Sequence, residues 1–319
     1  MTRVAGVLEH EHARPVVRAG AWVGVIAVRL PRHVVELRLR AIRTLPDSGG
    51  ILARDGSRVR HHRLVGIINV GLAPAWTLLD HRRAQLEAVE SGRSNAPRLS
   101  ARWGDEHEPS GSRLYEMART SILVGSDSLL ATRTLADGNI GAWAALALTR
   151  TTFEAAFWAQ WLLEPARRRD RLERGLRLQW DDRRERKLFA EGHLQARELT
   201  ELRREHEASC AAIKRDATAT GADLNLVTSK ISVVDELRRL ECAHDFRDLW
   251  VGIWRGLSGV QHGRIHAVEY FTDSDRVIGD DGIARVEITL NEERFSPNAM
   301  AAASLLRYAF DTYLRRSSS

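Results

Sequence analysis

The sequence NIGAWAALALTRTTFEAAFWAQWLL, residues 139–163, is rich in alanine, leucine and aromatic residues and contains no proline. Alanine and leucine favour a helix, and Pro165 forces a break soon after this stretch. We therefore predict a helix over Asn139–Leu163. At about 100° per residue, Trp143, Phe157 and Trp161 share one side of it. An aromatic side of this kind indicates a helix that packs into a core.

Two opposite charges lie in the middle of this aromatic side. Arg150 and Glu154 are the only formal charges between Asp137 and Glu164. An unpaired charge in a core costs several kcal/mol, so we expect them to pair with each other or with groups on a facing helix. One interpretation is a structural ion pair, in which Glu154→Ala would cost about 3–5 kcal/mol if the pair is buried. The other is that the pair lines or supports a polar site.

The helical pattern continues on both sides of this stretch. Ser112–Asp137 is predicted to be a helix closed by Gly138. Arg167–Ala217 is dense in charges of both signs, which is typical of one or two long helices with a solvated face. Further helices are predicted over Ser232–Leu240, over Asp245–Gly263, and from Ser296-Pro297 to about Arg315, with a loop at Gly221–Lys230.

A short β-hairpin interrupts the helices near the C-terminus. Arg264–Thr272 and Ala284–Leu290 alternate weakly between apolar and polar residues and contain valine, isoleucine, tyrosine and threonine. We predict that they pair as antiparallel strands, with the acidic residues of Asp273–Asp281 forming the connection rather than a calcium loop. The predicted fold is therefore mainly α: a multi-helix bundle with a small β-hairpin before the C-terminal helix.

The first third of the chain differs from the rest. Residues 1–100 contain 16 arginines, no lysine and 8 acidic residues, whereas the whole chain of 319 residues has a net charge of only +6. A basic arm can bind phosphate backbones, but GC-rich coding DNA would also produce a chain with three lysines among 48 basic residues. We predict a helical domain over residues 106–319 and a poorly defined, Arg-rich segment over residues 1–105. One hypothesis is that part of this segment lies upstream of the true start.

The composition excludes several classes of protein. The chain has two cysteines, Cys210 and Cys242, too few for a disulfide scaffold or a four-cysteine zinc site. No run of 18 residues is cleanly apolar, so we expect no stable insertion into a membrane. No nucleotide-binding loop, zinc spacing or nucleophile elbow is present. We expect a cytoplasmic protein without a cofactor or a metal site.

The strongest lead to chemistry is the sequence FRDLWVGIWRGLSGVQHG, residues 246–263. As a helix it has a core side formed by Leu249, Trp250, Ile253, Leu257 and Val260. Arg255 and His262 fall together on the opposite side, two turns and about 10 Å apart. Ser258 lies between the two sides. It could bond the preceding helical turn or orient a phosphate.

Four glycines, Gly252, Gly256, Gly259 and Gly263, form a stripe beside Arg255. Glycine costs about 1 kcal/mol relative to alanine in a helix interior, so the stripe needs a compensating role. Either another backbone approaches closely along it, or the helix unwinds near Gly256 and the glycines serve a loop.

The spacing Arg255-(six residues)-His262, the phrase WRGLSGVQHG and the preceding helix LTRTTFEAAFWAQWLLEP resemble the HEPN superfamily over residues of about 110–316. Many members are metal-independent endoribonucleases of toxin and phage-defence systems. The resemblance implies that Arg255 stabilises the phosphate and that His262 moves a proton during attack by the RNA 2′-hydroxyl. It also implies a homodimer, to which the glycine-striped helix would be suited. The chain departs from the family at Gly256, where the nucleases usually carry a polar residue, and this puts activity in doubt more than fold.

Three functions therefore remain open. The chain is either an RNA-cleaving HEPN-like protein or a non-catalytic helical module for binding or regulation. The third interpretation is a nucleic-acid binder that acts through its basic arm, residues 1–105. The three differ in whether RNA is cleaved and in which residues that requires.

Overall fold

The computed structural model describes residues 97–137, 142–243, 247–278 and 284–318, together with Thr77, residues 80–85 and Glu87. Most of the Arg-rich segment, including the hypothesis about its start and its proposed binding to phosphate backbones, lies outside the described residues. The described chain is mainly helical and carries a single antiparallel hairpin, which confirms the predicted fold class.

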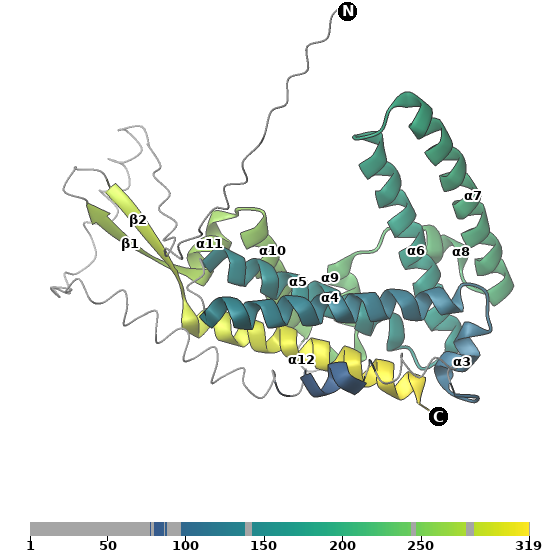
Figure 1. Ribbon diagram of the computed structural model, residues 1–319, viewed down its shortest axis with the longest axis horizontal. Coiled ribbons are helices and arrows are strands. Elements are labelled where there is room, and N and C mark those ends of the chain that lie inside the picture. Colours follow the sequence, from purple (N-terminus) through teal and green to yellow (C-terminus); the bar gives the residue numbers. More distant parts are fainter. Residues whose placement is uncertain are drawn as a thin grey trace, which may run out of the picture.

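Three long helices form the centre of the molecule. They are α4 (Gly111–Asp137), α5 (Ala142–Leu163) and α12 (Glu292–Ser317), and they lie side by side along the longest axis (Figure 1). Helix α5 packs against both of the others and against α10 (Arg247–Gln261), so it is surrounded. Its Phe157 and Trp161 are fully buried, as predicted, and Phe153 is buried with them. Trp143, predicted to lie on the same aromatic side, is 36% exposed because it lies in the first turn of α5, at the end of the bundle core.

A packed helix begins before residue 106, the predicted start of the helical domain. Helix α3 (Ala101–Glu106) is capped by Ser100, whose Oγ accepts a hydrogen bond of 3.1 Å from the Trp103 backbone N–H. Asp105, in its last turn, is completely buried. The carboxylate of Asp105 is bonded to Arg171 on the next layer of helices, and this contact fixes α3 to the body.

The charged stretch after Pro165 forms two long helices, α6 (Arg168–Glu191) and α7 (Ala196–Thr220). They pair with each other and project from the bundle as an arm (Figure 1). A small separate core at the base of this arm consists of Leu176, Ile213, Ala217 and Val227. The predicted loop 221–230 is wrong in part, because it contains the short helix α8 (Leu224–Thr228), capped by Asp223.

The chain then returns to the bundle through α9 (Val233–Arg239), the 3₁₀ turn η1 (Glu241–Ala243), α10 and α11 (Ile265–Phe271). Ser232 caps α9 as predicted, with its Oγ accepting from the Asp235 backbone N–H at 3.4 Å.

The hairpin is shifted along the sequence from its predicted position. Its strands are β1 (Thr272–Ile278) and β2 (Ala284–Leu290), which pair from Thr272 opposite Leu290 to Ile278 opposite Ala284. The second strand is as predicted. The first is not, because α11 occupies 265–271 and the supposed acidic connection forms most of β1. Packing of Ala267 and Phe271 in the core decides this conformation, against the strand preference of the valine, isoleucine and tyrosine residues.

The last helix also starts earlier than predicted. Asn291 caps α12 by accepting a hydrogen bond of 3.1 Å from the Arg294 backbone N–H. Pro297 therefore lies inside the helix instead of at its start. The N-cap is therefore Asn291, where the chain leaves the hairpin, and not the predicted Ser296. None of the helices in the described ranges is long and apolar enough to cross a membrane.

Candidate functional site

The segment that carries Arg255 and His262 is one continuous helical rod. Helix α10 runs unbroken through Arg255, and the His262 N–H still bonds the Ser258 carbonyl at 3.1 Å. Gly263 then ends the helix with a φ of +64°, and the Arg264 N–H bonds back to the Gly259 carbonyl at 2.8 Å. This is a left-handed C-terminal cap, which favours glycine. The rod therefore does not unwind at Gly256.

Arg255 and His262 are both exposed on this rod. Among the described residues, the side chain of neither forms a hydrogen bond or an ion pair. The opposite side of α10 is buried through Trp250, Ile253 and Leu257, as predicted. The structure therefore places the arginine and histidine on one flank, about two helical turns apart.

Two assignments to the core side of α10 need correction. Leu249 is 56% exposed, although it was predicted to be in the core. It lies in the first turn of α10 at the margin of the core side, about 60° from its centre. Val251, which was not predicted to be in the core, is buried.

The Arg150–Glu154 pair lies against this same helix. Arg150 Nη2 and Glu154 Oε2 are 2.9 Å apart, and the Arg150 guanidinium lies over the Trp254 indole with its Cζ 5.3 Å from the ring centroid. The Arg150 side chain is 9% exposed, whereas that of Glu154 is 35% exposed. The pair is thus buried at its arginine and open at its carboxylate. The loss of about 3–5 kcal/mol predicted for Glu154→Ala assumed a fully buried pair. It is too large for a carboxylate that is partly exposed.

Three buried donors in this contact have no acceptor within the described chain. They are Nε and Nη1 of Arg150 and Nε1 of Trp254. Ser258 lies one turn beyond Trp254 on the same side of α10 and is half-buried. The structure therefore brings Arg150, Glu154, Trp254 and Ser258 to the strip between α5 and α10, next to the Arg255 flank. Sequence reasoning missed Trp254, although an off-core tryptophan directly before Arg255 was a usable signal.

The glycine stripe has three different roles. A Cβ atom built on Gly259 would lie 2.7 Å from the Ala267 Cβ, and one on Gly256 would lie 3.1 Å from Phe271 Cε2. Both contacts are with α11 of the same chain, so the close approach predicted for the stripe occurs within the molecule. Gly263 makes the turn between the two helices, and a Cβ atom built on Gly252 would meet no atom of the described residues within 4 Å.

These contacts predict opposite effects of alanine at two positions of one helix. Gly259→Ala should lower the free energy of unfolding by about 1–3 kcal/mol, because the short, rigid Ala267 side chain cannot move aside. Gly252→Ala should raise it by up to about 1 kcal/mol, because alanine favours the helix and meets nothing there. Urea denaturation of both variants checks the prediction. A stabilised Gly259→Ala variant would show that α11 does not pack on this side.

A cleft of about 410 Å³ lies on another part of the molecule. It is formed by the corner between α5 and α6, the first turns of α6, and residues of α8, α9 and η1. Arg174, Arg177 and Glu236 line its interior. The charged residues of α6 were predicted to lie on a solvated face. This prediction is wrong for Arg171 and Arg177, because both are buried.

Glu236 is the most heavily bonded group of the cleft. Its carboxylate accepts from Trp161 Nε1 at 3.0 Å, from Arg177 Nη1 at 2.8 Å and from Arg239 Nη1 at 3.0 Å. Burial would raise the pKa of Glu236, but these hydrogen bonds and the two arginine charges outweigh it, so the pKa lies below its ordinary value. The only sequence signal for Glu236 was its place in the acidic first turn of α9. Acidic residues in a first turn also stabilise the helix end, so this signal did not indicate a cleft.

Cys242 lies beside this cleft as a free thiol. Burial and the neighbouring Glu164 carboxylate raise its pKa well above the ordinary value, so the thiol stays protonated. Within the described residues, no group of histidine, cysteine and acidic side chains is arranged to hold a metal ion.

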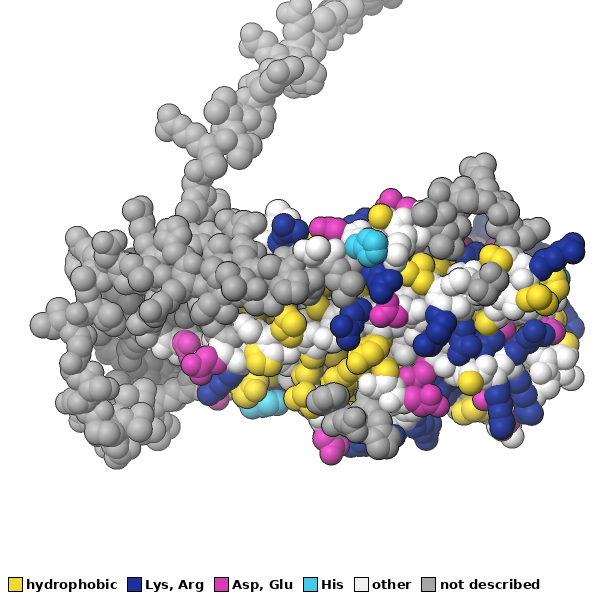
Figure 2. Space-filling view, turned by 90° about the horizontal axis from the view of Figure 1, so that it is seen from below, with side chains coloured by type: hydrophobic (Ala, Val, Ile, Leu, Met, Phe, Trp, Pro, Cys, Tyr) yellow, Lys and Arg dark blue, Asp and Glu magenta, His cyan; other side chains and the backbone are white. Residues whose placement is uncertain are grey.

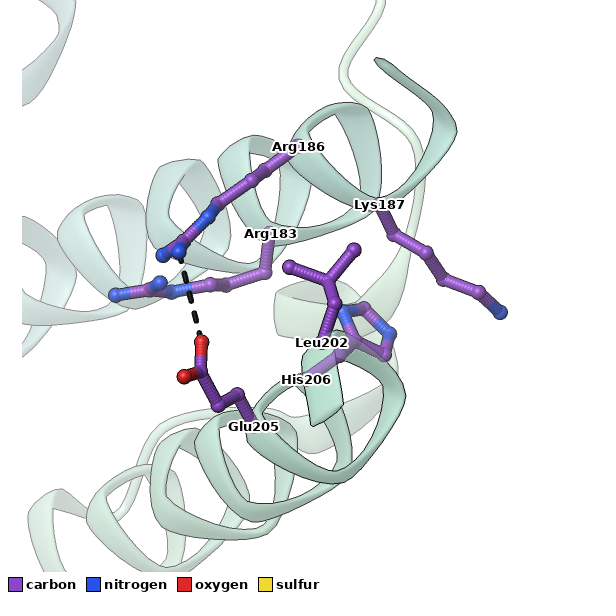
Figure 3. Close-up of a pocket in the computed structure, with 6 residues that line it drawn as sticks. All are labelled: Arg183, Arg186, Lys187, Leu202, Glu205 and His206. Atoms are coloured by element: carbon purple, nitrogen blue, oxygen red, sulfur yellow. Dashed lines mark ion pairs between the residues drawn. The ribbon is translucent and has the colours of Figure 1, made fainter. Parts of the chain in front are cut away.

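A second, much smaller pocket lies in the arm. Its volume is about 10 Å³, room for about one water molecule. Figure 3 shows the Arg186–Glu205 ion pair of 3.5 Å across it, between α6 and α7. The lining also includes Arg183, Lys187, Leu202 and His206. The pocket is a packing gap between two helices and is too small for a ligand.

Comparison of the chain with models of protein families, with curated proteins and with solved structures gave no match.

Proposed function

We propose that this chain is a HEPN-like, metal-independent endoribonuclease whose site is the exposed flank of α10. The observation that supports this most directly is the placement of Arg255 and His262. Both project from the same side of one unbroken rod, away from its buried side. An arginine and a histidine two turns apart can both reach one phosphodiester, because the arginine side chain is long and can extend toward the histidine. Neither side chain is held by a partner in the described chain.

The chemistry follows from these two groups. The imidazole of His262 takes the proton of an RNA 2′-hydroxyl, whose oxygen then attacks the adjacent phosphorus. The P–O5′ bond breaks, which leaves a 2′,3′-cyclic phosphate and a 5′-oxygen that must gain a proton. The guanidinium of Arg255 neutralises the charge that builds up on the phosphate oxygens. Arg150 and Trp254 lie alongside and would support the shape of this flank.

A homodimer completes the proposed site. One imidazole cannot both take the first proton and give the second at the same instant, so a second copy would supply the other histidine. Helix α11 already covers Gly256 and Gly259, so we propose that the partner packs near Gly252, which no described residue covers. By its resemblance to the HEPN superfamily, we propose that the protein acts in the cytoplasm as part of a toxin or phage-defence system.

The face of the molecule seen in Figure 2 carries both signs of charge. Lysine and arginine side chains gather toward the end that holds α3, with acidic side chains among them. A long RNA duplex would need a continuous basic surface. We therefore propose a short single-stranded segment, and not a long duplex, as the substrate of the α10 flank.

Cleavage of total RNA in the presence of EDTA tests the proposal. His262→Ala and Arg255→Ala should each slow cleavage at least about a hundredfold, the range for loss of one proton-transfer or charge-stabilising group. His266→Ala and Arg247→Ala are the matched controls, since both residues are exposed and lie near the flank. They should change the rate by less than about twofold.

Two results would contradict the nuclease. One is a protein, folded by circular dichroism, that leaves RNA intact. The other is cleavage that survives both His262→Ala and Arg255→Ala. Either result favours the alternative, a non-catalytic helical module for binding or regulation.

A further inference from the structure

The cleft between α5, α6, α8 and α9 has the size of a small-molecule site and does not depend on the proposed nuclease. Its volume of about 410 Å³ falls in the usual range for ligand pockets. Its floor contains the buried ion pair of Arg177 and Glu236, and a buried pair of this kind forms a rigid polar wall.

Arg174 also lines the cleft, and no carboxylate of the described chain is in contact with its guanidinium. Its Nη1 donates to the Trp161 carbonyl at 2.6 Å, and its guanidinium lies over the Trp161 ring at 5.3 Å. Burial lowers the pKa of Arg174, while the charges of Glu164, Glu236, Asp170 and Glu241 act to raise it. None of these carboxylates forms an ion pair of 4.0 Å or less with Arg174 in the described chain.

Glu164 is the matching anion. Its Oε1 accepts from the Cys242 backbone N–H at 3.0 Å and from Gln160 Nε2 at 3.3 Å, which are both neutral donors. It too has no ion pair among the described residues. A cation and an anion therefore line one cavity without an ion pair between them, and each is positioned by its own hydrogen bonds.

The remaining charges of the cleft restrict what could fill it. Its lining has four arginines and five acidic residues, so it carries both signs of charge in nearly equal number. A polyanion such as RNA would meet as much repulsion as attraction there. An apolar ligand would bury charged walls at a cost of several kcal/mol.

We propose that this cleft binds a small zwitterion of the amino-acid class, with its carboxylate on Arg174 and its ammonium group on Glu164. A guanidinium can hold a carboxylate through two parallel hydrogen bonds. An ammonium group beside Glu164 supplies the counter-charge that the cleft lacks.

Calorimetric titration with the standard amino acids, on the full chain, tests this inference. At least one should bind with a dissociation constant of about 1 mM or lower. For that amino acid, the matched amine without a carboxylate and the matched acid without an amine should each bind at least about tenfold more weakly.

Variants then locate the site. Glu164→Gln and Arg174→Gln should each weaken binding at least about tenfold. Arg169→Gln is the control, because Arg169 is exposed in the first turn of α6 and does not line the cleft. Glu164→Gln keeps an oxygen that can accept the two neutral hydrogen bonds, so it remains informative if Arg174→Gln unfolds.

The inference is overturned if none of the amino acids binds, if the matched amine or acid binds as tightly, or if binding is unchanged in both variants. RNA binding that depends on Arg174 would also overturn it, because the cleft would then accept a polyanion. None of these results bears on cleavage at the α10 flank, so the two proposals fail separately.

Discussion

Replacing Asp105 with alanine is expected to lower the free energy of unfolding by about 3–5 kcal/mol, the usual cost of leaving a buried charge without its partner. Asp105 is completely buried and the Arg171 side chain is 3% exposed. Two parallel hydrogen bonds of 2.7 Å join Arg171 Nε and Nη2 to the two carboxylate oxygens. Removal of the carboxylate would leave the guanidinium charge in a site that excludes water.

The same pair joins parts of the chain that are distant in sequence. The Tyr115 hydroxyl of α4 donates to Asp105 at 2.8 Å, and Arg171 Nη1 donates to the Pro165 and Ala166 carbonyls at 2.9 and 2.7 Å. Asp105 is therefore the point at which α3, α4 and α6 meet. Asp105→Ala should therefore also detach α3 from the body, and faster proteolytic cleavage near Ser100 would detect this.

Urea denaturation measures the effect, with Glu106→Ala as the control in the same helix. Glu106 pairs with Arg102 at 2.7 Å but is partly exposed, so its loss should cost less than about 1 kcal/mol. The double variant Asp105→Ala, Arg171→Met should be more stable than Asp105→Ala alone, because it removes the stranded charge. A cost below about 1 kcal/mol for Asp105→Ala would mean that water reaches the pair.

Local signals predicted the fold where they were strong. Gly138 and Pro165 bound α4 and α5 in the sequence, and both helices end at the predicted residues, Asp137 and Leu163. Helical periodicity likewise placed Arg255 and His262 on one exposed flank. These features depend on neighbours within a few residues, which the sequence displays directly.

The features that sequence reasoning missed depend on partners far away. Asp105 and Arg171 are 66 positions apart, and Arg177 and Glu236 are 59 apart. Within α6, the two buried arginines are indistinguishable by pattern from their exposed neighbours. Only the tertiary structure selects which of them is buried, so neither the anchor of α3 nor the cleft could be read from charge spacing.

Glu236→Ala is expected to cost about 3–5 kcal/mol, for a similar reason at the floor of the cleft. Glu236 is 4% exposed, and its loss leaves Arg177 buried without a counter-charge. The Trp161 indole N–H would also lose its acceptor. Asp235→Ala, one position earlier in α9, is the control, since Asp235 pairs with Arg238 at the surface and its loss should be nearly neutral.

The isosteric variant Glu236→Gln turns the same group into a test of pH dependence. The pKa of Glu236 is lower in the folded protein than in the unfolded chain, so the unfolded chain binds the proton more tightly. The stability that the carboxylate contributes is therefore fully present above the unfolded pKa of about 4.3 and is lost as the pH falls through the folded pKa. Unfolding free energies of the two proteins, measured between about pH 7 and pH 3, should differ most at neutral pH and converge in acid. Parallel curves over this range would show that folding does not lower the pKa of Glu236, and the ionic floor of the cleft would then have to be abandoned.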